Sequence, residues 1–180
     1  MDFSRFEFIR LTPDFNLSHE FNCGDADLND FLLNDALNYQ NELLAVTYLL
    51  IDGDQTVAFF SLLNDRISIL DVESNRKWAK LFRDIMPKGK RFKSYPAMKI
   101  GRLGVSEKYK GAGIGTMIID YLKELFISNN RTGCKYITVD AYNLSLSFYV
   151  KNGFNYLTQS DEGKATRLMY FDLILMKKED

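Results

Sequence analysis

The sequence predicts an α+β fold of one domain, in which a mixed sheet is flanked by helices. The chain has 180 residues, which is enough for one sizeable buried core. Segments with the apolar patterns of strands are interspersed with segments of helical periodicity. No repeat, low-complexity tract or linker divides the chain, so the predicted domain covers residues 1–180.

The first half of the chain predicts a strand, a helix and two further strands. Residues 6–11 alternate well enough for an opening strand. Asp25 is suited to be the N-cap of the helix that follows. Residues 45–51 form a continuous apolar run that fits a buried strand, and an Asp-Gly pair then predicts a hairpin turn to a strand over 57–63, extended at 67–69. The apolar stripe of the helix comprises Leu28, Phe31, Leu32, Ala36 and Tyr39.

The second half begins with a predicted helix over residues 74–86, which has apolar residues on one side and basic residues elsewhere. Pro and Gly end it, and residues 74–93 are predicted to form a helical insertion before the central strand, 98–105. A helix over 114–125 follows, and Gly153 has the left-handed position after a later, short helix. The remaining predicted elements are a loop at 129–133, a strand at 136–141, the short helix at 145–150 and antiparallel closing strands at 154–157 and 168–176.

The net charge of −1 hides an uneven distribution of charged residues. Residues 14–42 contain seven acidic residues and no Lys or Arg, whereas residues 76–93 contain eight basic residues and one acidic residue, a net charge of +7. This asymmetry indicates an anionic partner near the basic segment. The alternative interpretation of the basic segment is a solvated helix and loop.

Composition excludes several classes of protein. No apolar run approaches the roughly 20 residues that span a bilayer, and the N-terminus lacks a signal pattern, so the expected location is cytoplasmic. Cys23 and Cys134 lie far apart in sequence and belong to no partner motif. With His19 as the single histidine, no metal site is expected, and His19 is assigned to a loop or helix start.

Three glycines at alternate positions lie between the central strand and the next helix: Gly111, Gly113 and Gly115. Glycines at a helix start let backbone N–H groups approach a phosphate, so this turn is predicted to bind a pyrophosphate. A dinucleotide fingerprint would need glycine at Thr116, and the chain has no Gly-Lys-Ser/Thr tripeptide of a P-loop, so both motifs are rejected. A plain connection without a ligand remains the alternative.

A second block of sequence bears on whether this turn binds a ligand. A strand ending at Ala141 is followed by Asn143, by Phe148 and Tyr149, and by a Gly-Phe pair at 153–154. Together with Lys-Gly-Ala-Gly-Ile-Gly at residues 110–115, this block resembles the GNAT superfamily of acyl-CoA-dependent N-acetyltransferases. The family pattern begins with Arg or Gln, so Lys110 is the one departure, which keeps the charge without the planar fork of arginine.

The resemblance implies a mostly antiparallel mixed sheet splayed in a V, with acetyl-CoA as cosubstrate and no metal. Tyr149 matches the family tyrosine near the sulfur and would act as general acid to the CoA thiolate, while its alternative is packing in the core beside Phe148. The oxyanion donor would be a backbone N–H near Val105. Asn143 would steady the cofactor, with a helix N-cap as its alternative role. The implied cofactor-binding residues are Leu103, Val105, Lys110, Gly111, Ala112, Gly113, Ile114, Gly115, Thr116 and Asn143.

The general base and the acceptor amine stay open. Asp65, Glu73 and Asp140 are candidate bases, and direct attack or a water relay are alternatives to all three.

Residues 21–32, with the Tyr-Pro lead-in at 95–96, resemble a GNAT subgroup that includes the aminoacyl-tRNA-acetylating toxins of toxin–antitoxin modules. That resemblance implies tRNA binding through residues 76–93, although the sequence pI of about 5.9 is low for a nucleic-acid binder. The first expectation is therefore a small-molecule or protein amine, with toxin-like acetylation of aminoacyl-tRNA as the alternative. A non-catalytic acyl-CoA-binding regulatory domain is a second alternative. A homodimer is compatible with the family, and an antitoxin partner is left open.

Overall fold

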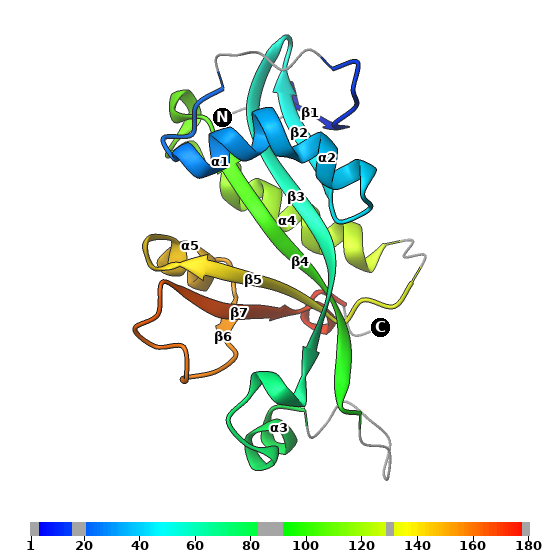
Figure 1. The fold of residues 1–180 in the computed structure, drawn as a ribbon, viewed down its shortest axis with the longest axis vertical. Coiled ribbons are helices and arrows are strands. Elements are labelled where there is room, and N and C mark those ends of the chain that lie inside the picture. Colours follow the sequence, from blue (N-terminus) through cyan, green and yellow to red (C-terminus); the bar gives the residue numbers. More distant parts are fainter. Residues whose placement is uncertain (1–3, 16–20, 83–91, 129–131, 178–180) are drawn as a thin grey trace. The chain divides into compact units, whose positions relative to one another are not determined.

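The computed structural model describes residues 4–15, 21–82, 92–128 and 132–177 (Figure 1). These residues form two compact units. Unit 1 comprises Met1–Leu63 and Ile100–Tyr121, and unit 2 comprises Asn64–Lys99 and Leu122–Asp180. No helix among the described residues is long and apolar enough to cross a membrane.

Seven strands pair in the order β1-β2-β3-β4-β5-β7-β6. The pairing of β4 with β5 is parallel, while β1 with β2, β2 with β3, β5 with β7 and β6 with β7 pair antiparallel. The predicted α+β class with a mixed sheet is therefore confirmed. The strands are β1 (Glu7–Arg10), β2 (Val46–Asp52), β3 (Gln55–Ser68), β4 (Ser94–Val105), β5 (Tyr136–Tyr142), β6 (Asn155–Tyr156) and β7 (Thr166–Asp172).

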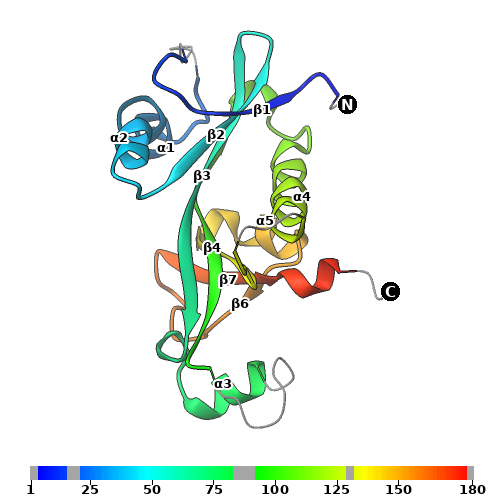
Figure 2. The same cartoon turned by 90° about the vertical axis from the view of Figure 1, so that its right-hand side faces the viewer.

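Unit 1 has helices on both faces of its part of the sheet (Figure 2). One face is covered by α1 (Ala26–Asp30), a π-helical turn (Phe31–Asp35) and α2 (Ala36–Asn41). The Asp25 carboxylate accepts a hydrogen bond of 3.1 Å from the Leu28 amide, so the predicted N-cap is confirmed. The core under these helices comprises Leu11, Phe21, Cys23, Phe31, Leu32, Ala36, Leu49 and Phe59.

The opposite face of the same strands packs against α4 (Ile114–Ile127). Because side chains alternate along a strand, Phe8 lies on this face and stacks on Tyr121 of α4 at 4.0 Å between ring centroids. The predicted hairpin between β2 and β3 is present, with Gly53 at φ +58° in its turn. β3 runs without a break through both segments that the sequence had suggested, because residues 64–66 continue the strand.

Unit 2 contains α3 (Asn75–Leu81) between β3 and β4, as the predicted insertion requires. The Ser74 hydroxyl caps this helix, and the indole nitrogen of Trp78 donates to the Phe92 carbonyl at 3.1 Å. The predicted helix over 74–86 is confirmed for Asn75–Leu81, and residues 83–91 lie outside the described residues. The core of this region comprises Ile67, Val72, Trp78, Phe82, Tyr95, Ala97, Tyr136 and Leu157.

The C-terminal elements of unit 2 follow the expected order, with two differences in length. The short helix is split into a 3-10 turn (Asn143–Ser145) and α5 (Leu146–Lys151), and Gly153 follows at φ +82°. β6 has only two residues. The last predicted strand ends at Asp172, because its carboxylate accepts from the Ile174 amide and starts a 3-10 turn.

Candidate active site

The glycine turn of unit 1 has the geometry that the sequence predicts. β4 ends at Val105, and α4 begins at Ile114. Gly111 and Gly113 have φ values of +77° and +83°, which L side chains rarely adopt. A Cβ at Gly111 would meet no described atom within 4 Å, so the surface of the turn is open there.

The turn leaves several backbone donors unused. The amides of Lys110 and Ala112 donate to the carbonyls of Glu107 and Tyr109, both at 3.3 Å, and the first helical bond runs from the Met117 amide to the Gly113 carbonyl. Among the described residues, no acceptor is found for four other amides. Unpaired N–H groups at the positive end of a 14-residue helix form a ready anion site. These amides are those of Gly113, Ile114, Gly115 and Thr116.

The segment before α1 packs directly on the residues that lead into the turn. The Glu107 amide donates to the Asn22 carbonyl at 2.9 Å, and the Asn22 side chain donates back to the Glu107 carboxylate at 3.3 Å. A Cβ at Gly24 would lie 2.7 Å from Glu107 Oε1 and 2.9 Å from Lys110 Nζ. Lys110 itself pairs with Glu107 at 3.6 Å and stays more than half exposed. The sequence singled out residues 21–32 by resemblance but did not predict this contact.

Leu103 and Val105 are half-buried on β4, where the resemblance implies pairing with the cofactor. Gly104 faces the other side of the strand, where a Cβ would lie 2.7 Å from the Phe59 ring. Alternation therefore places Leu103 and Val105 on the face away from that part of the core.

Tyr149 lies on α5 in unit 2 and is only 5% exposed. Its ring meets Phe148 and Phe154 edge-on, at 5.0 and 5.3 Å between centroids. No hydrogen-bond partner for the hydroxyl is found among the described residues, and burial raises the pKa of the phenol above its usual value. Tyr149 thus packs beside Phe148 and also keeps its proton at neutral pH.

Asn143 is the first residue of the 3-10 turn after β5, and its side chain is exposed. Its Nδ2 donates to the Lys164 carbonyl at 3.1 Å. The N-cap of α5 is Ser145, and no side chain bonds there. The predicted alternative role of Asn143 as a helix N-cap is therefore wrong, because the 3-10 turn places the N-cap two residues later, at Ser145.

Two candidate bases are held by one lysine in unit 2. Lys99 Nζ lies 2.7 Å from Asp140 Oδ2 and 3.8 Å from Asp65 Oδ2. The buried Thr138 hydroxyl donates to Asp65 at 2.6 Å. Burial opposes the charge of Lys99, but the hydrogen bond and charge of Asp140, with the charge of Asp65, outweigh it and raise the pKa of Lys99.

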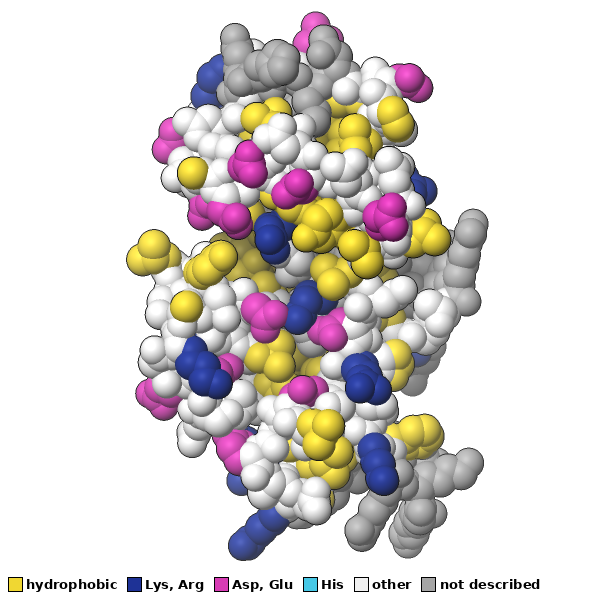
Figure 3. Space-filling view, viewed as in Figure 1, with side chains coloured by type: hydrophobic (Ala, Val, Ile, Leu, Met, Phe, Trp, Pro, Cys, Tyr) yellow, Lys and Arg dark blue, Asp and Glu magenta, His cyan; other side chains and the backbone are white. Residues whose placement is uncertain are grey.

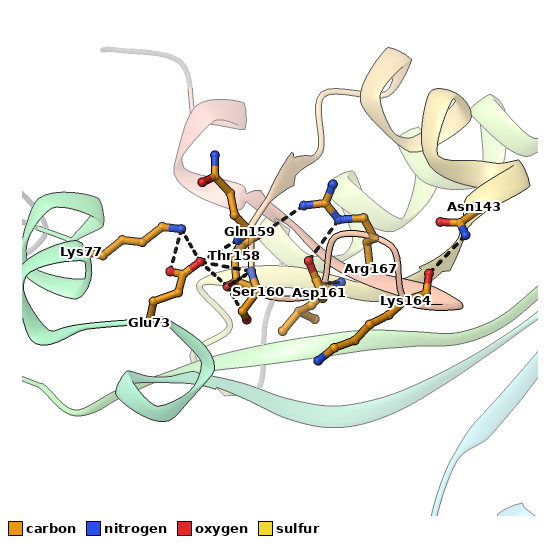
Figure 4. Close-up of polar contacts among 10 residues, drawn as sticks. Glu73, Lys77, Asn143, Thr158, Gln159, Ser160, Asp161, Lys164 and Arg167 are labelled. Atoms are coloured by element: carbon orange, nitrogen blue, oxygen red, sulfur yellow. Dashed lines mark hydrogen bonds and ion pairs between the residues drawn. The ribbon is translucent and has the colours of Figure 1, made fainter.

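The third candidate, Glu73, lies beside a groove of about 960 Å³ next to α3. The Lys77 ammonium, the Thr158 hydroxyl and the Gln159 amide donate to its carboxylate and hold its pKa well below the usual range (Figure 4). Glu73 is therefore a poor proton acceptor near neutral pH. The groove is lined by Glu73, Ser74, Arg76, Lys77, Lys80, Leu81, Gln159 and Ser160.

The charge asymmetry of the sequence is partly visible on the surface. Figure 3 shows acidic side chains gathered over α1 and α2, and the exposed acids of this region are Asp25, Asp27, Asp30, Asp35 and Glu42. Of the eight basic residues at 76–93, the structure describes Arg76, Lys77, Lys80 and Lys93, and the other four lie outside the described residues. His19 lies outside the described residues as well.

The described residues contain neither a candidate metal site nor a disulfide. Within the described part of the chain, no group of three or more His, Cys, Asp or Glu is placed to hold a metal ion. Cys23 and Cys134 are both free.

Comparison with known proteins identifies the fold. Residues 79–156 match the family model described as an acetyltransferase (GNAT) domain. These residues contain the glycine turn, Asn143 and Tyr149. Residues 79–156 are thus similar to a GNAT acetyltransferase domain.

Solved structures share this GNAT fold over nearly the whole chain. A KacT mutant aligns with a TM-score of 0.77 and 17% identity over 96% of this chain and 97% of its own. AtaTR bound with AcCoA aligns with a TM-score of 0.74 and 20% identity over 96% of this chain and 98% of its own. AtaT complexed with acetyl-methionyl-tRNAfMet aligns with a TM-score of 0.73 and 20% identity over 95% of this chain and 96% of its own. No curated protein gives a significant match.

Proposed function

We propose that this GNAT domain transfers an acetyl group from acetyl-CoA to an amine in a ternary complex. The observation that supports this most strongly is the set of amides from Gly113 to Thr116, for which no acceptor is found among the described residues and which lies at the start of α4, where Gly111 and Gly113 are left-handed. The family match supports an acyltransferase, and similar structures have been solved with acetyl-CoA bound.

The residues of unit 1 fit the cosubstrate. The four amides would hold the diphosphate, since each is a donor at the positive end of the helix. The ammonium of Lys110, which is more than half exposed and ion-paired with Glu107, lies at the start of the same turn. Leu103 and Val105 would pair with the pantetheine through their backbone. By the family resemblance, Asn143, whose side chain is exposed, would steady the cofactor.

The reaction forms one bond and breaks another. The amine nitrogen attacks the thioester carbon, and the carbon–sulfur bond breaks. The departing thiolate receives the proton of Tyr149, the nitrogen loses a proton to water, and the Tyr149 phenolate regains a proton from water. A backbone N–H near Val105 would stabilise the oxyanion. Because burial raises the pKa of Tyr149, its hydroxyl is in the protonated form that a proton donor must have.

We infer that no carboxylate among the three candidates acts as general base. Asp65 and Asp140 are engaged by Lys99, and Glu73 is engaged by Lys77 and the loop after β6. The amine would therefore lose its proton to water, either before attack or through a water relay.

A small-molecule or protein amine is the first candidate acceptor. Aminoacyl-tRNA is the second, and a specific observation favours it: Arg76, Lys77 and Lys80 line one groove, where they could contact phosphates. AtaT, which has the same fold, has been solved in complex with acetyl-methionyl-tRNAfMet, and its toxin mutant with the C-terminus of the antitoxin AtaR.

A thiol-release assay tests the proposal. The protein is incubated with acetyl-CoA and either a panel of primary amines or a charged tRNA pool, and free CoA thiol is followed. Acceptor-dependent release is expected with one of the two. Binding of acetyl-CoA without acceptor-dependent release would instead indicate a non-catalytic acyl-CoA-binding domain.

Induced expression of the protein in cells, with growth as the readout, distinguishes the two candidate acceptors. Growth arrest that is lost in Tyr149→Phe would favour aminoacyl-tRNA, and normal growth with active enzyme would favour a small-molecule or protein amine.

A further inference from the structure

The loop between β6 and β7 in unit 2, residues 157–165, is fastened to its surroundings at three places (Figure 4). Glu73, which precedes α3, binds its first part. An ion pair between Asp161 and Arg167 closes its middle, and Asn143 binds the Lys164 carbonyl near its end. One loop therefore joins a candidate cofactor residue to the wall of the basic groove.

Glu73 makes the densest set of contacts in this network. Its Oε1 accepts from the Thr158 hydroxyl and the Gln159 amide, both at 2.7 Å, and from the Ser160 amide at 3.3 Å. Lys77 Nζ lies 2.9 Å from the same oxygen and 2.7 Å from Oε2. One carboxylate thus satisfies two loop amides, a hydroxyl and an ammonium.

The middle of the loop is closed by a largely buried ion pair. Arg167 Nε donates to Asp161 Oδ1 at 3.0 Å, and its other nitrogen donates to the Thr158 carbonyl at 3.0 Å. The second Asp161 oxygen accepts from the Leu168 amide at 2.7 Å, and the Arg167 guanidinium covers the Tyr156 ring at 4.2 Å. The exposed residues of the loop consequently lie between the Glu73 contacts on one side and the Asp161–Arg167 contacts on the other.

The exposed residues between these contacts are Gln159 and Ser160, which line the groove together with Arg76 and Lys80. Neither Arg76 nor Lys80 forms an ion pair with a described residue, whereas Lys77 is neutralised by Glu73. The groove therefore has a polar wall held in place by Glu73 and two cations that are available to a ligand.

We propose that Glu73 is a positioning residue for the acceptor: it locks residues 158–160 against the start of α3 and so shapes the groove in which the acceptor binds. This inference rests on the proposed transferase function. It assigns Glu73 a role in binding the acceptor and none in binding acetyl-CoA or in proton transfer.

Four proteins test this role: the unmodified chain, Glu73→Ala, Glu73→Gln and the matched control Glu162→Gln, an exposed acid of the same loop. The acceptor is the amine or the charged tRNA pool that gives the highest thiol release with the unmodified chain. Hydrogen exchange of the loop is measured on the same samples, because it reports the lock directly.

Glu73→Ala is expected to speed exchange at the Gln159 and Ser160 amides. It is also expected to raise the acceptor KM roughly tenfold, because the acceptor would then have to order the loop that a charge-assisted hydrogen bond now holds. The acetyl-CoA KM should stay within about twofold. Glu73→Gln keeps the shape and a carbonyl acceptor, so it should recover part of the loss. Glu162→Gln should behave like the unmodified chain.

A variant of lower stability does not block the test. If Glu73→Ala fails to fold, Thr158→Val, which removes one hydroxyl donor and leaves Lys77 paired, is expected to give a smaller change in the same direction. Unchanged exchange, or equal rises in both KM values, would overturn the role of Glu73. Absence of acceptor-dependent release by the unmodified chain would instead overturn the proposed function and this role with it.

Discussion

Lys99 Nζ and Asp140 Oδ2 lie 2.7 Å apart on the neighbouring parallel strands β4 and β5. Asp65 of β3 lies 3.8 Å from the same nitrogen, so one cation stands between two carboxylates. The three side chains are one-quarter to one-half exposed. The cluster therefore binds three strands of unit 2 together, and it leaves neither carboxylate free to act as a base.

Replacing the cation should destabilise the protein in a pH-dependent way. Lys99→Met leaves Asp65 and Asp140 without their shared partner, and a cost of about 1 kcal/mol is expected for such partly exposed groups. Because pairing raises the folded-state pKa of Lys99, this contribution is complete below the unfolded-state pKa of about 10.4 and is lost as pH rises through the folded-state value.

Urea denaturation from pH 7 to pH 11 measures this difference. The gap in unfolding free energy between the unmodified chain and Lys99→Met should be constant to about pH 10 and shrink above it. A gap that widens with pH would show that the stabilising pair does not involve Lys99.

Removing the Tyr149 hydroxyl should affect turnover alone. Because this hydroxyl has no hydrogen-bond partner among the described residues, Tyr149→Phe should fold with unchanged melting temperature and unchanged acetyl-CoA affinity. Loss of a general acid typically lowers the rate by about 100-fold or more, which thiol release would detect. Phe148→Leu, a change in the neighbouring ring, is the packing control. Equal losses of rate in both variants would assign Tyr149 to the core.

The close approach of Gly24 to Glu107 and Lys110, at the start of the glycine turn, predicts a remote effect on acetyl-CoA binding. Gly24→Ala places a methyl group against Glu107 and Lys110, at a residue with φ +78°. Gly53→Ala is the matched control, because it has φ +58° and no described neighbour within 4 Å. Both variants should lose about 1 kcal/mol from backbone strain, but only Gly24→Ala should also weaken acetyl-CoA binding. Calorimetry showing equal affinity in the two variants would contradict this coupling.

The basic groove gives a prediction for the second candidate acceptor. If aminoacyl-tRNA is the substrate, the double variant Arg76→Ala/Lys80→Ala should raise the tRNA KM and reduce the salt dependence of binding by about two ions. Lys151→Ala, an exposed lysine of α5, is the control. An unchanged salt dependence would remove the groove from the tRNA interface.

Local chemistry made most of the fold predictable. Asp25 was predicted as an N-cap because an aspartate before a helical stripe can accept a hydrogen bond from an amide of the first turn, and the bond from the Leu28 amide is present. The end of β7 was missed because apolar residues continue past Asp172, and a strand cannot be distinguished from a 3-10 turn by periodicity alone.

The turn between β4 and α4 was predictable from local sequence, whereas contacts between distant segments were not. Gly111 and Gly113 lie in the predicted turn, and both have positive φ values in the structure. The hydrogen bond from Asn143 to Lys164 joins residues 21 positions apart, and that between Glu73 and Thr158 joins residues 85 apart. No spacing rule within one segment predicts such contacts, so the contacts of Asn143 and Glu73 became visible only in the structure.

Calorimetric binding of acetyl-CoA to Gly113→Val tests the phosphate-binding turn most directly. Gly53→Val serves as control, because Gly53 is also left-handed but lies in the hairpin between β2 and β3, outside the turn that precedes α4. A branched Cβ at Gly113 should block the approach of the diphosphate to the amides of α4, so affinity should fall roughly tenfold or more, while Gly53→Val stays within about twofold of the unmodified chain. Unchanged affinity in Gly113→Val would show that these amides do not hold the diphosphate.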